Sequence, residues 1–292
     1  MNGTPEPPAA SRHPVDADRV AAVLHAAGVR RFTVDHVGST GSTNADLAAR
    51  AASGTVTDRT VLLAEEQVSG RGRMGRPWSA PAGSQFICSV LLAPEQLDIE
   101  RLGELPLFIG VAIAGAAREL GVPAVLKWPN DVQVVRDGTP HKLAGILVEA
   151  ASIDPPAIVP GIGLNLSMTA ADFEDAGLPA ATSLTLEGLE IPDAGARDHV
   201  TAVILRHLLA VDDAWRAGGD AAADVRARYR ELSSTLGTRV RAELPGGENL
   251  YGTAVDLGPH GELVLESVDG TRHTVTAGDV VHVRPDAREN YN

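Results

Sequence analysis

The chain has 292 residues, 44% hydrophobic and 22% charged, which is the usage of a folded globular protein and excludes a disordered or fibrous one. Its 25 Lys and Arg against 38 Asp and Glu give a net charge of −13, the wrong sign for a general binder of nucleic-acid phosphates. The single cysteine, Cys88, excludes an intramolecular disulfide and a zinc site made of several thiolates. With neither a signal-peptide pattern nor an apolar run long enough to cross a bilayer, we expect a cytoplasmic protein that binds no membrane.

The N-terminal region begins with a Pro- and Ala-rich stretch. Residues 1–18 carry too few large apolar side chains to offset chain entropy, which predicts a flexible tail. A helix is expected over residues 19–27, ended by Gly28, and a first strand over residues 31–34. Only about forty residues precede the first strong motif, so we expect no compact DNA-binding module and no sequence-specific DNA binding.

Short apolar runs then alternate with turn residues. They predict strands of one mixed sheet at residues 61–64, 86–92, 125–127, 132–135, 145–148 and 158–166. Residues 107–120 are apolar nearly all round, which indicates a helix buried against that sheet. Apolar side chains that recur every three or four positions predict a second long helix around residues 200–215, followed by a third over residues 220–232.

After residue 233 the pattern changes to short strands between turns such as Pro245-Gly246-Gly247 and Asp269-Gly270. Five short strands in about sixty residues predict a small β-barrel. The sequence therefore predicts an α+β protein: a mixed sheet with flanking helices in a larger domain over residues 19–233, and a small β domain over residues 234–292.

A glycine-rich segment follows the strand predicted at residues 61–64. Gly70, Gly72 and Gly75 match the G-x-G-x-x-G pattern of dinucleotide-binding proteins letter for letter. That pattern must open a helix, whereas here Pro77 and Pro81 follow and the next predicted element is a strand. The context therefore argues against a dinucleotide fold.

The same segment carries three arginines, Arg71, Arg73 and Arg76. Glycines let backbone N–H groups approach a ligand, and guanidinium groups are shaped to bind carboxylate or phosphate. A solvated basic loop is the alternative. We favour a site for anions because three cations cluster in a chain of net charge −13.

Two later segments place lysines at strand ends: residues 127–132, which read Lys-Trp-Pro-Asn-Asp-Val, and residues 142–149, which begin with Lys142. Such lysines can face a cleft, and Asn130 and Asp131 can hold a nucleotide or a magnesium ion. Pro-Asn-Asp is equally typical of a simple turn between strands. Spacing alone leaves both interpretations open.

Two smaller signals remain ambiguous by themselves. Gly161 and Gly163 lie inside a predicted strand, where glycine marks either a bulge or the close approach of a ligand to the backbone. Ser42, Thr43 and Asn44 precede a predicted helix and are typical of its N-cap, although the same groups can bind a small polar ligand.

Taken together and in this order, these motifs closely resemble those of the biotin protein ligases, strongly over residues 36–185 and weakly in the C-terminal part. The resemblance implies a mixed sheet related to class II synthetases, followed by an SH3-like domain. It also implies a two-step reaction, in which biotin and ATP form biotinyl-5′-AMP and a lysine of a carrier protein then accepts the biotinyl group.

The resemblance also implies roles for individual residues. The biotin site would contain Ser42, Thr43, Asn44, Gln67, Arg71, Gly72, Arg73, Lys142 and Gly145. The ATP or adenylate site would contain Arg73, Arg76, Trp78, Lys127, Asn130 and Asn165. Lys142 and Arg73 would be catalytic, and Asp131 would contact Mg²⁺.

The expected partner is the biotin carboxyl carrier protein or domain of an acyl-CoA or pyruvate carboxylase. Two other functions compete with this interpretation. A lipoate protein ligase would share the fold and the adenylate chemistry, but its Arg-Arg and Gly-Gly-Gly arrangement is missing here. A sensor that binds biotin without transferring it would not need both Lys142 and the arginine-rich loop.

Overall fold

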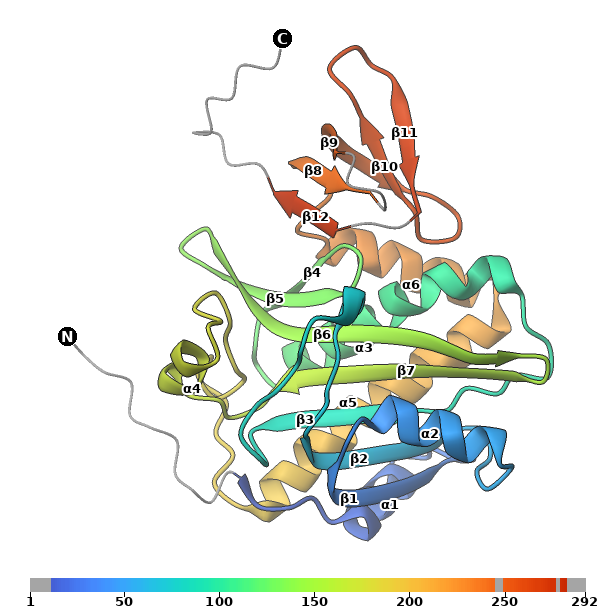
Figure 1. The fold of residues 1–292 in the computed structure, drawn as a ribbon, viewed down its shortest axis with the longest axis vertical. Coiled ribbons are helices and arrows are strands. Elements are labelled where there is room, and N and C mark those ends of the chain that lie inside the picture. Colours follow the sequence, from blue (N-terminus) through green and yellow to red (C-terminus); the bar gives the residue numbers. More distant parts are fainter. Residues whose placement is uncertain (1–11, 245–248, 277–278, 283–292) are drawn as a thin grey trace.

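We describe the protein from a computed structural model that covers residues 12–244, 249–276 and 279–282. Figure 1 shows a larger body built on a long mixed sheet and a smaller β domain beside one end of it. None of the helices in these ranges is long and apolar enough to cross a membrane.

Seven strands form the large sheet in the order β1-β2-β3-β7-β6-β5-β4. Their bounds are β1 (Thr33–Thr40), β2 (Thr60–Gln67), β3 (Gln85–Val90), β4 (Ala124–Lys127), β5 (Asp131–Arg136), β6 (Thr139–Ile153) and β7 (Pro156–Asn165). Strands β1 and β2 are parallel, and all other neighbours are antiparallel. The predicted mixed sheet is confirmed.

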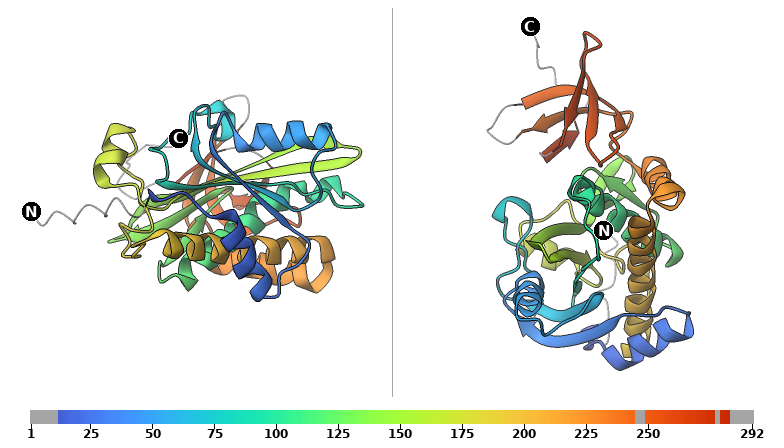
Figure 2. Two further views of the ribbon diagram at one scale, coloured as in Figure 1. Left: turned by 90° about the horizontal axis from the view of Figure 1, so that it is seen from below. Right: turned by 90° about the vertical axis from the view of Figure 1, so that its right-hand side faces the viewer.

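Helices cover both faces of this sheet. They are α1 (Ala17–Ala26), α2 (Thr43–Ala52), α3 (Leu105–Glu119), α4 (Ala170–Asp175), α5 (Ala194–Ala217) and α6 (Gly219–Leu232), with two short 3₁₀ segments, η2 (Arg73–Gly75) and η3 (Ile99–Glu104). Figure 2 shows α2 alone on one face, and α1, α3 and α5 on the other. Helix α3 is apolar nearly all round because it is buried between the sheet and α5.

The C-terminal domain is a five-stranded antiparallel sheet in the order β11-β10-β9-β8-β12. Its strands are β8 (Arg239–Glu243), β9 (Asn249–Leu257), β10 (Leu263–Glu266), β11 (Arg272–Val275) and β12 (Asp279–His282). The five predicted strands are confirmed. Within the part of the chain that the structure describes, the edge strands β11 and β12 do not pair, so the sheet stays open there.

The predicted tail of residues 1–18 is too long at its C-terminal end. Residues 1–11 lie outside the described residues, but helix α1 already begins at Ala17, capped by Asp16. Arg12 pairs with Asp172 at 2.5 Å, and the backbone N–H of Val15 donates to the buried carboxylate of Glu65 at 2.8 Å. These distant partners fix residues 12–16, which local composition cannot reveal.

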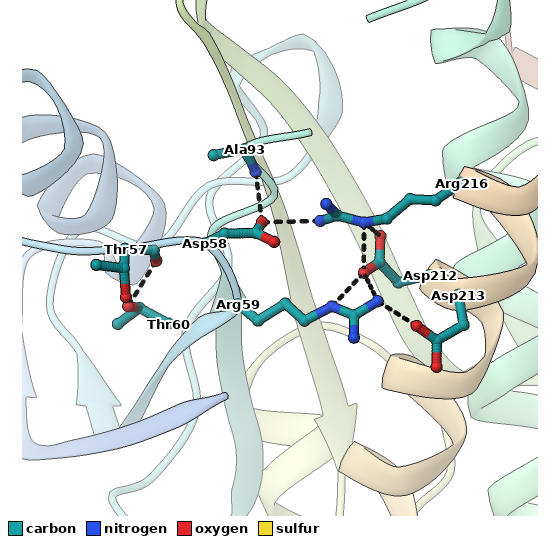
Figure 3. Close-up of polar contacts among 8 residues, drawn as sticks. All are labelled: Thr57, Asp58, Arg59, Thr60, Ala93, Asp212, Asp213 and Arg216. Carbon is teal, nitrogen blue, oxygen red and sulfur yellow. Dashed lines mark hydrogen bonds and ion pairs between the residues drawn. The ribbon is translucent and has the colours of Figure 1, made fainter. Parts of the chain in front are cut away.

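An ion-pair cluster holds the start of β2 against helix α5 (Figure 3). Asp212 accepts from Arg59 at 2.7 Å and from Arg216 at 2.9 Å, and its side chain is only 5% exposed. Arg216 also reaches Asp58 at 2.8 Å, and Arg59 reaches the exposed Asp213. The cluster lies at the opposite end of β2 from Gln67.

Candidate functional site

The predicted site residues gather on the face of the sheet that α2 covers. Its floor includes Gly145 of β6 and Gly163 of β7, which are directly paired across the two strands. No bulge interrupts β7 at Gly161 or Gly163, since the irregular pairing in this hairpin lies between Ala150 and Ser152. The strand glycines therefore mark close approach to the backbone.

The Trp78 side chain lies against both of these glycines. A Cβ on Gly163 would lie 2.5 Å from the indole Nε1, and a Cβ on Gly145 would lie 3.8 Å from the far edge of the ring. The indole N–H donates to Gln85 at 3.1 Å. The two glycines thus leave room for an aromatic ring to lie directly on the sheet.

The arginine-rich loop runs from Gly70 to Arg76 and folds back on itself. The N–H of Gly72 donates to the carbonyl of Arg76 at 2.8 Å, and that of Trp78 donates to Gly70 at 2.9 Å. Met74 and Gly75 have φ values of 58° and 71°, and only a short 3₁₀ turn forms. The loop opens no α-helix, which confirms the rejection of a dinucleotide fold.

Cationic side chains meet beside this loop. Arg73 donates to Asn130 Oδ1 at 3.3 Å, and Lys142 pairs with Asp131 at 2.7 Å. Burial lowers the pKa of Lys127 and that of Arg73, and neighbouring cations lower both further, against the opposing effect of Asp131. An anion placed among these groups would relieve their mutual repulsion.

The remaining cations and Asn165 take different positions. Arg71 and Arg76 lie on the loop with largely exposed side chains. Asn165 is 2% exposed; its amide accepts from Gln85 at 2.8 Å and donates to the carbonyl of Thr182 at 2.9 Å. It therefore connects the floor to the residues that support Lys142.

A second group of polar side chains lies at the start of α2. The backbone N–H and hydroxyl of Thr43 donate to Gln67 Oε1 at 2.8 and 3.0 Å. The Ser89 hydroxyl lies within hydrogen-bond distance of the Thr43 hydroxyl, at 2.7 Å, and of Asn44 Oδ1, at 2.6 Å. Ser42 caps the helix, as its residue type predicts.

Asn44 joins this group to the floor. Its amide donates to Glu149 at 2.7 Å, and a Cβ on Gly161 would strike its Oδ1 at 2.2 Å. Because Gly161 and Gly163 lie on the same face of β7, Asn44 and Trp78 lie over neighbouring positions of one surface. The structure thus brings the two predicted subsites together.

Sequence reasoning missed Gln85, Ser89 and Glu149. The first two lie on one face of β3, four residues apart in an otherwise apolar strand. Two polar side chains at that spacing inside a buried strand were a usable signal. Glu149 offered no such signal, because its partner Asn44 is 105 positions away.

Comparison with known proteins gives concordant matches. A model of the biotin/lipoate A/B protein ligase family matches residues 38–165, and a model of the biotin protein ligase C-terminal domain matches residues 235–283. A biotin--[acetyl-CoA-carboxylase] ligase of Mycobacterium tuberculosis is 44% identical over 278 residues, which are 94% of this chain and 97% of that protein.

More distant relatives agree. The bifunctional ligase/repressor BirA of Escherichia coli is 30% identical over 225 residues, which are 75% of this chain and 64% of that protein. A biotin protein ligase of Aquifex aeolicus, solved in complex with biotin and ATP, superposes with a TM-score of 0.70 at 24% identity, covering 86% of this chain and 98% of that one. This last likeness is one of fold.

Proposed function

The chain belongs to the family of biotin protein ligases, and from that premise we propose how its residues share the ATP-dependent attachment of biotin to a protein lysine. In the first step a biotin carboxylate oxygen attacks the α-phosphorus of ATP, and pyrophosphate leaves as biotinyl-5′-AMP forms. In the second, a lysine amine of the carrier attacks the acyl carbon, loses its proton and releases AMP.

The observation that carries the assignment is the placing of Arg73, Lys127 and Lys142 around one patch of glycine floor. Biotin carboxylate and ATP are both anions and repel each other as they approach. Fixed cations offset this repulsion and the charge that builds in the transition state. We assign Lys142 and Arg73 to this catalytic role.

The floor divides into two regions. On the α2 side we place biotin, held by the polar group around Thr43 and by the first turn of the arginine-rich loop. That biotin set is Ser42, Thr43, Asn44, Gln67, Arg71, Gly72, Arg73, Lys142 and Gly145. On the other side we place the nucleotide, with the Trp78 ring as a stacking face for adenine.

The nucleotide set is Arg73, Arg76, Trp78, Lys127, Asn130 and Asn165. In the structure, the side-chain amide oxygen and nitrogen of Asn130 form hydrogen bonds within the protein, and so do those of Asn165. Asn130 is partly exposed beside Arg73, which suits a direct contact with ATP. Asn165 is buried, so its contribution includes holding Gln85 beneath Trp78.

Magnesium fits this site only as a companion of ATP. Among the described residues no three His, Cys, Asp or Glu side chains cluster as a metal site. Mg²⁺ is commonly held by one or two carboxylates together with substrate phosphates, and Asp131 offers one such carboxylate beside the nucleotide region. When bound, the ion would neutralise phosphate charge.

The acceptor we propose is a lysine on the biotin carrier protein or domain of an acyl-CoA or pyruvate carboxylase, in the cytoplasm. The relative from Mycobacterium tuberculosis is named for an acetyl-CoA carboxylase, which supports this class of partner.

One experiment tests the function directly. Purified protein with Mg²⁺, ATP and biotin should exchange labelled pyrophosphate into ATP without any acceptor. Lipoate in place of biotin should give no exchange, and exchange with lipoate alone would favour a lipoate ligase. Adding a carrier domain should transfer biotin to it, whereas exchange without transfer would indicate a sensor.

A further inference from the structure

Trp128 lies within the Lys127–Asp131 segment but faces away from the site. Strand β4 alternates buried and partly exposed residues and ends at the partly exposed Lys127, whereas Trp128, the next residue, is only 2% exposed. Its indole N–H donates to the carbonyl of Gly261 at 2.9 Å, and its backbone N–H donates to Thr235 at 3.0 Å. Both partners lie beyond the end of α6.

Gly261 belongs to the turn between β9 and β10, residues 258–261, which fits tightly against η3 and α3. Gly261 has a φ of +91°, and a Cβ there would lie 2.4 Å from Leu107 Cδ1 and 2.7 Å from the carbonyl of Gly103. A Cβ on Gly103 would in turn lie 2.6 Å from the carbonyl of His260. Neither glycine of this contact has room for a side chain.

Two residues after Trp128, the chain enters the site. Asn130 donates to the carbonyl of Ile146 at 2.9 Å and accepts from Arg73 at 3.3 Å. A chain of contacts therefore runs from the turn through Trp128 to Asn130 and the arginine-rich loop. The hydrogen bonds that hold Thr43 and Gln67 include no residue of the C-terminal sheet in the described part of the chain.

We propose that the 258–261 turn of the C-terminal domain positions Lys127 and Asn130 through Trp128, and thereby sets how ATP, but not biotin, is held. Trp128 and Gly261 are positioning residues that touch no substrate. The inference rests on the proposed placement of ATP beside Lys127 and Asn130. Because positioning errors of about 1 Å can cost up to ~100-fold in rate, a small displacement of this turn should be measurable.

The test compares two glycines of the same small domain. Gly261→Ala places a Cβ against Leu107 and Gly103, whereas Gly270→Ala sits in the β10–β11 turn at a φ of +83° with nothing within 4 Å. Both variants carry similar backbone strain, but only the first disturbs the contact with Trp128. Biotin-dependent pyrophosphate release gives KM for ATP, and calorimetry gives Kd for biotin.

Gly261→Ala should raise KM for ATP about tenfold or more, or lower kcat to the same degree, with Kd for biotin unchanged. Gly270→Ala should leave both constants at the wild-type values. Two results with folded Gly261→Ala would overturn the proposal: an unchanged KM for ATP and kcat, or a Kd for biotin that rises as much as KM for ATP.

A second variant decides the matter if Gly261→Ala does not fold. Trp128→Phe keeps the buried ring but removes the N–H that reaches Gly261, and we expect a severalfold rise in KM for ATP without a change in biotin affinity. Wild-type ATP kinetics in this variant would overturn the inference. If wild-type protein itself releases no pyrophosphate with biotin, the proposed function fails instead.

Discussion

Lys142 and Asp131 form an ion pair, with the lysine Nζ 2.7 Å from the carboxylate Oδ1. The same Nζ lies 5.3 Å from the centre of the Trp78 ring, so the ammonium is held over the glycine floor rather than extended into solvent. Both charged side chains stay partly exposed, at 34% and 20%. A substrate anion can therefore reach Lys142 and compete with Asp131 for it.

Replacing Lys142 by Met should slow adenylate formation while leaving the fold intact, because the side chain is only partly buried. A charge-assisted hydrogen bond is worth about 1.5–3 kcal/mol, or ~10- to 100-fold in rate, and the charge of the transition state should place the loss at the upper end. Pyrophosphate release measures it. A near-normal rate in a folded Lys142→Met protein would assign the lysine a structural role only.

Asp131→Asn separates two roles of this carboxylate. If Asp131 contacts Mg²⁺, the concentration of Mg²⁺ needed for half-maximal pyrophosphate release should rise in the variant, because one anionic ligand is lost. Lys142→Met serves as the control, since it breaks the same ion pair but keeps the carboxylate. A slower Asp131→Asn enzyme with an unchanged Mg²⁺ midpoint would leave Asp131 as an anchor for Lys142 alone.

Lys127 should make ATP use sensitive to alkaline pH. Burial lowers its pKa below the ordinary lysine value of 10.5, so the free enzyme loses this positive charge as pH rises through that lowered pKa. We expect kcat/KM for ATP to fall in the same range, because that ratio reports the free enzyme. In Lys127→Arg the fall should move to higher pH; an unchanged profile would show that another group titrates.

The cluster around Asp212 should matter for stability and not for catalysis. Removing one partner of a buried ion pair costs about 3–5 kcal/mol, so Asp212→Ala should lower the free energy of unfolding by roughly that amount. Asp213→Ala is the control: its side chain is 69% exposed, and exposed pairs contribute about 0–1 kcal/mol. Urea unfolding compares them. Equal losses, or reduced activity of folded Asp212→Ala at low temperature, would contradict this.

Much of the fold could be predicted because its signals are local. The apolar runs located β2 to β7 of the large sheet, whereas the strand expected at residues 31–34 overlaps only the start of β1. Helix α3 was recognised because a helix buried on all sides has no polar face. The predicted tail failed at residues 12–16, where order comes from Glu65, Arg197 and Asp172, far away in the sequence. Composition reports only local chain preference.

The candidate site shows the same division. Residue type alone favoured an anion site at the arginine-rich loop, whereas the lysine motifs and the strand glycines stayed ambiguous. Which glycine accommodates which side chain depends on strand register, and the pairing of Gly145 with Gly163 cannot be read from either motif alone. The hydrogen bond between Trp128 and the C-terminal domain could not be predicted either, because its partner Gly261 is 133 positions away.

The contact between Gly163 and Trp78 yields a prediction that tests the floor itself. A Cβ at position 163 would overlap the indole at 2.5 Å, so Gly163→Ala must displace either the ring or the strand. Overpacking of this kind costs about 1–3 kcal/mol of stability, and displacement of Trp78 should also slow adenylate formation, by up to ~100-fold. Gly38→Ala is the control, since a Cβ on that β1 glycine meets nothing within 4 Å.

The loss of stability in Gly163→Ala should shrink in a Trp78→Ala background, where the overlapping ring is gone. Urea unfolding of the two single variants and the double variant measures this coupling. Additive losses would mean that the strain at Gly163 does not come from Trp78, and that the ring does not rest on the floor in solution.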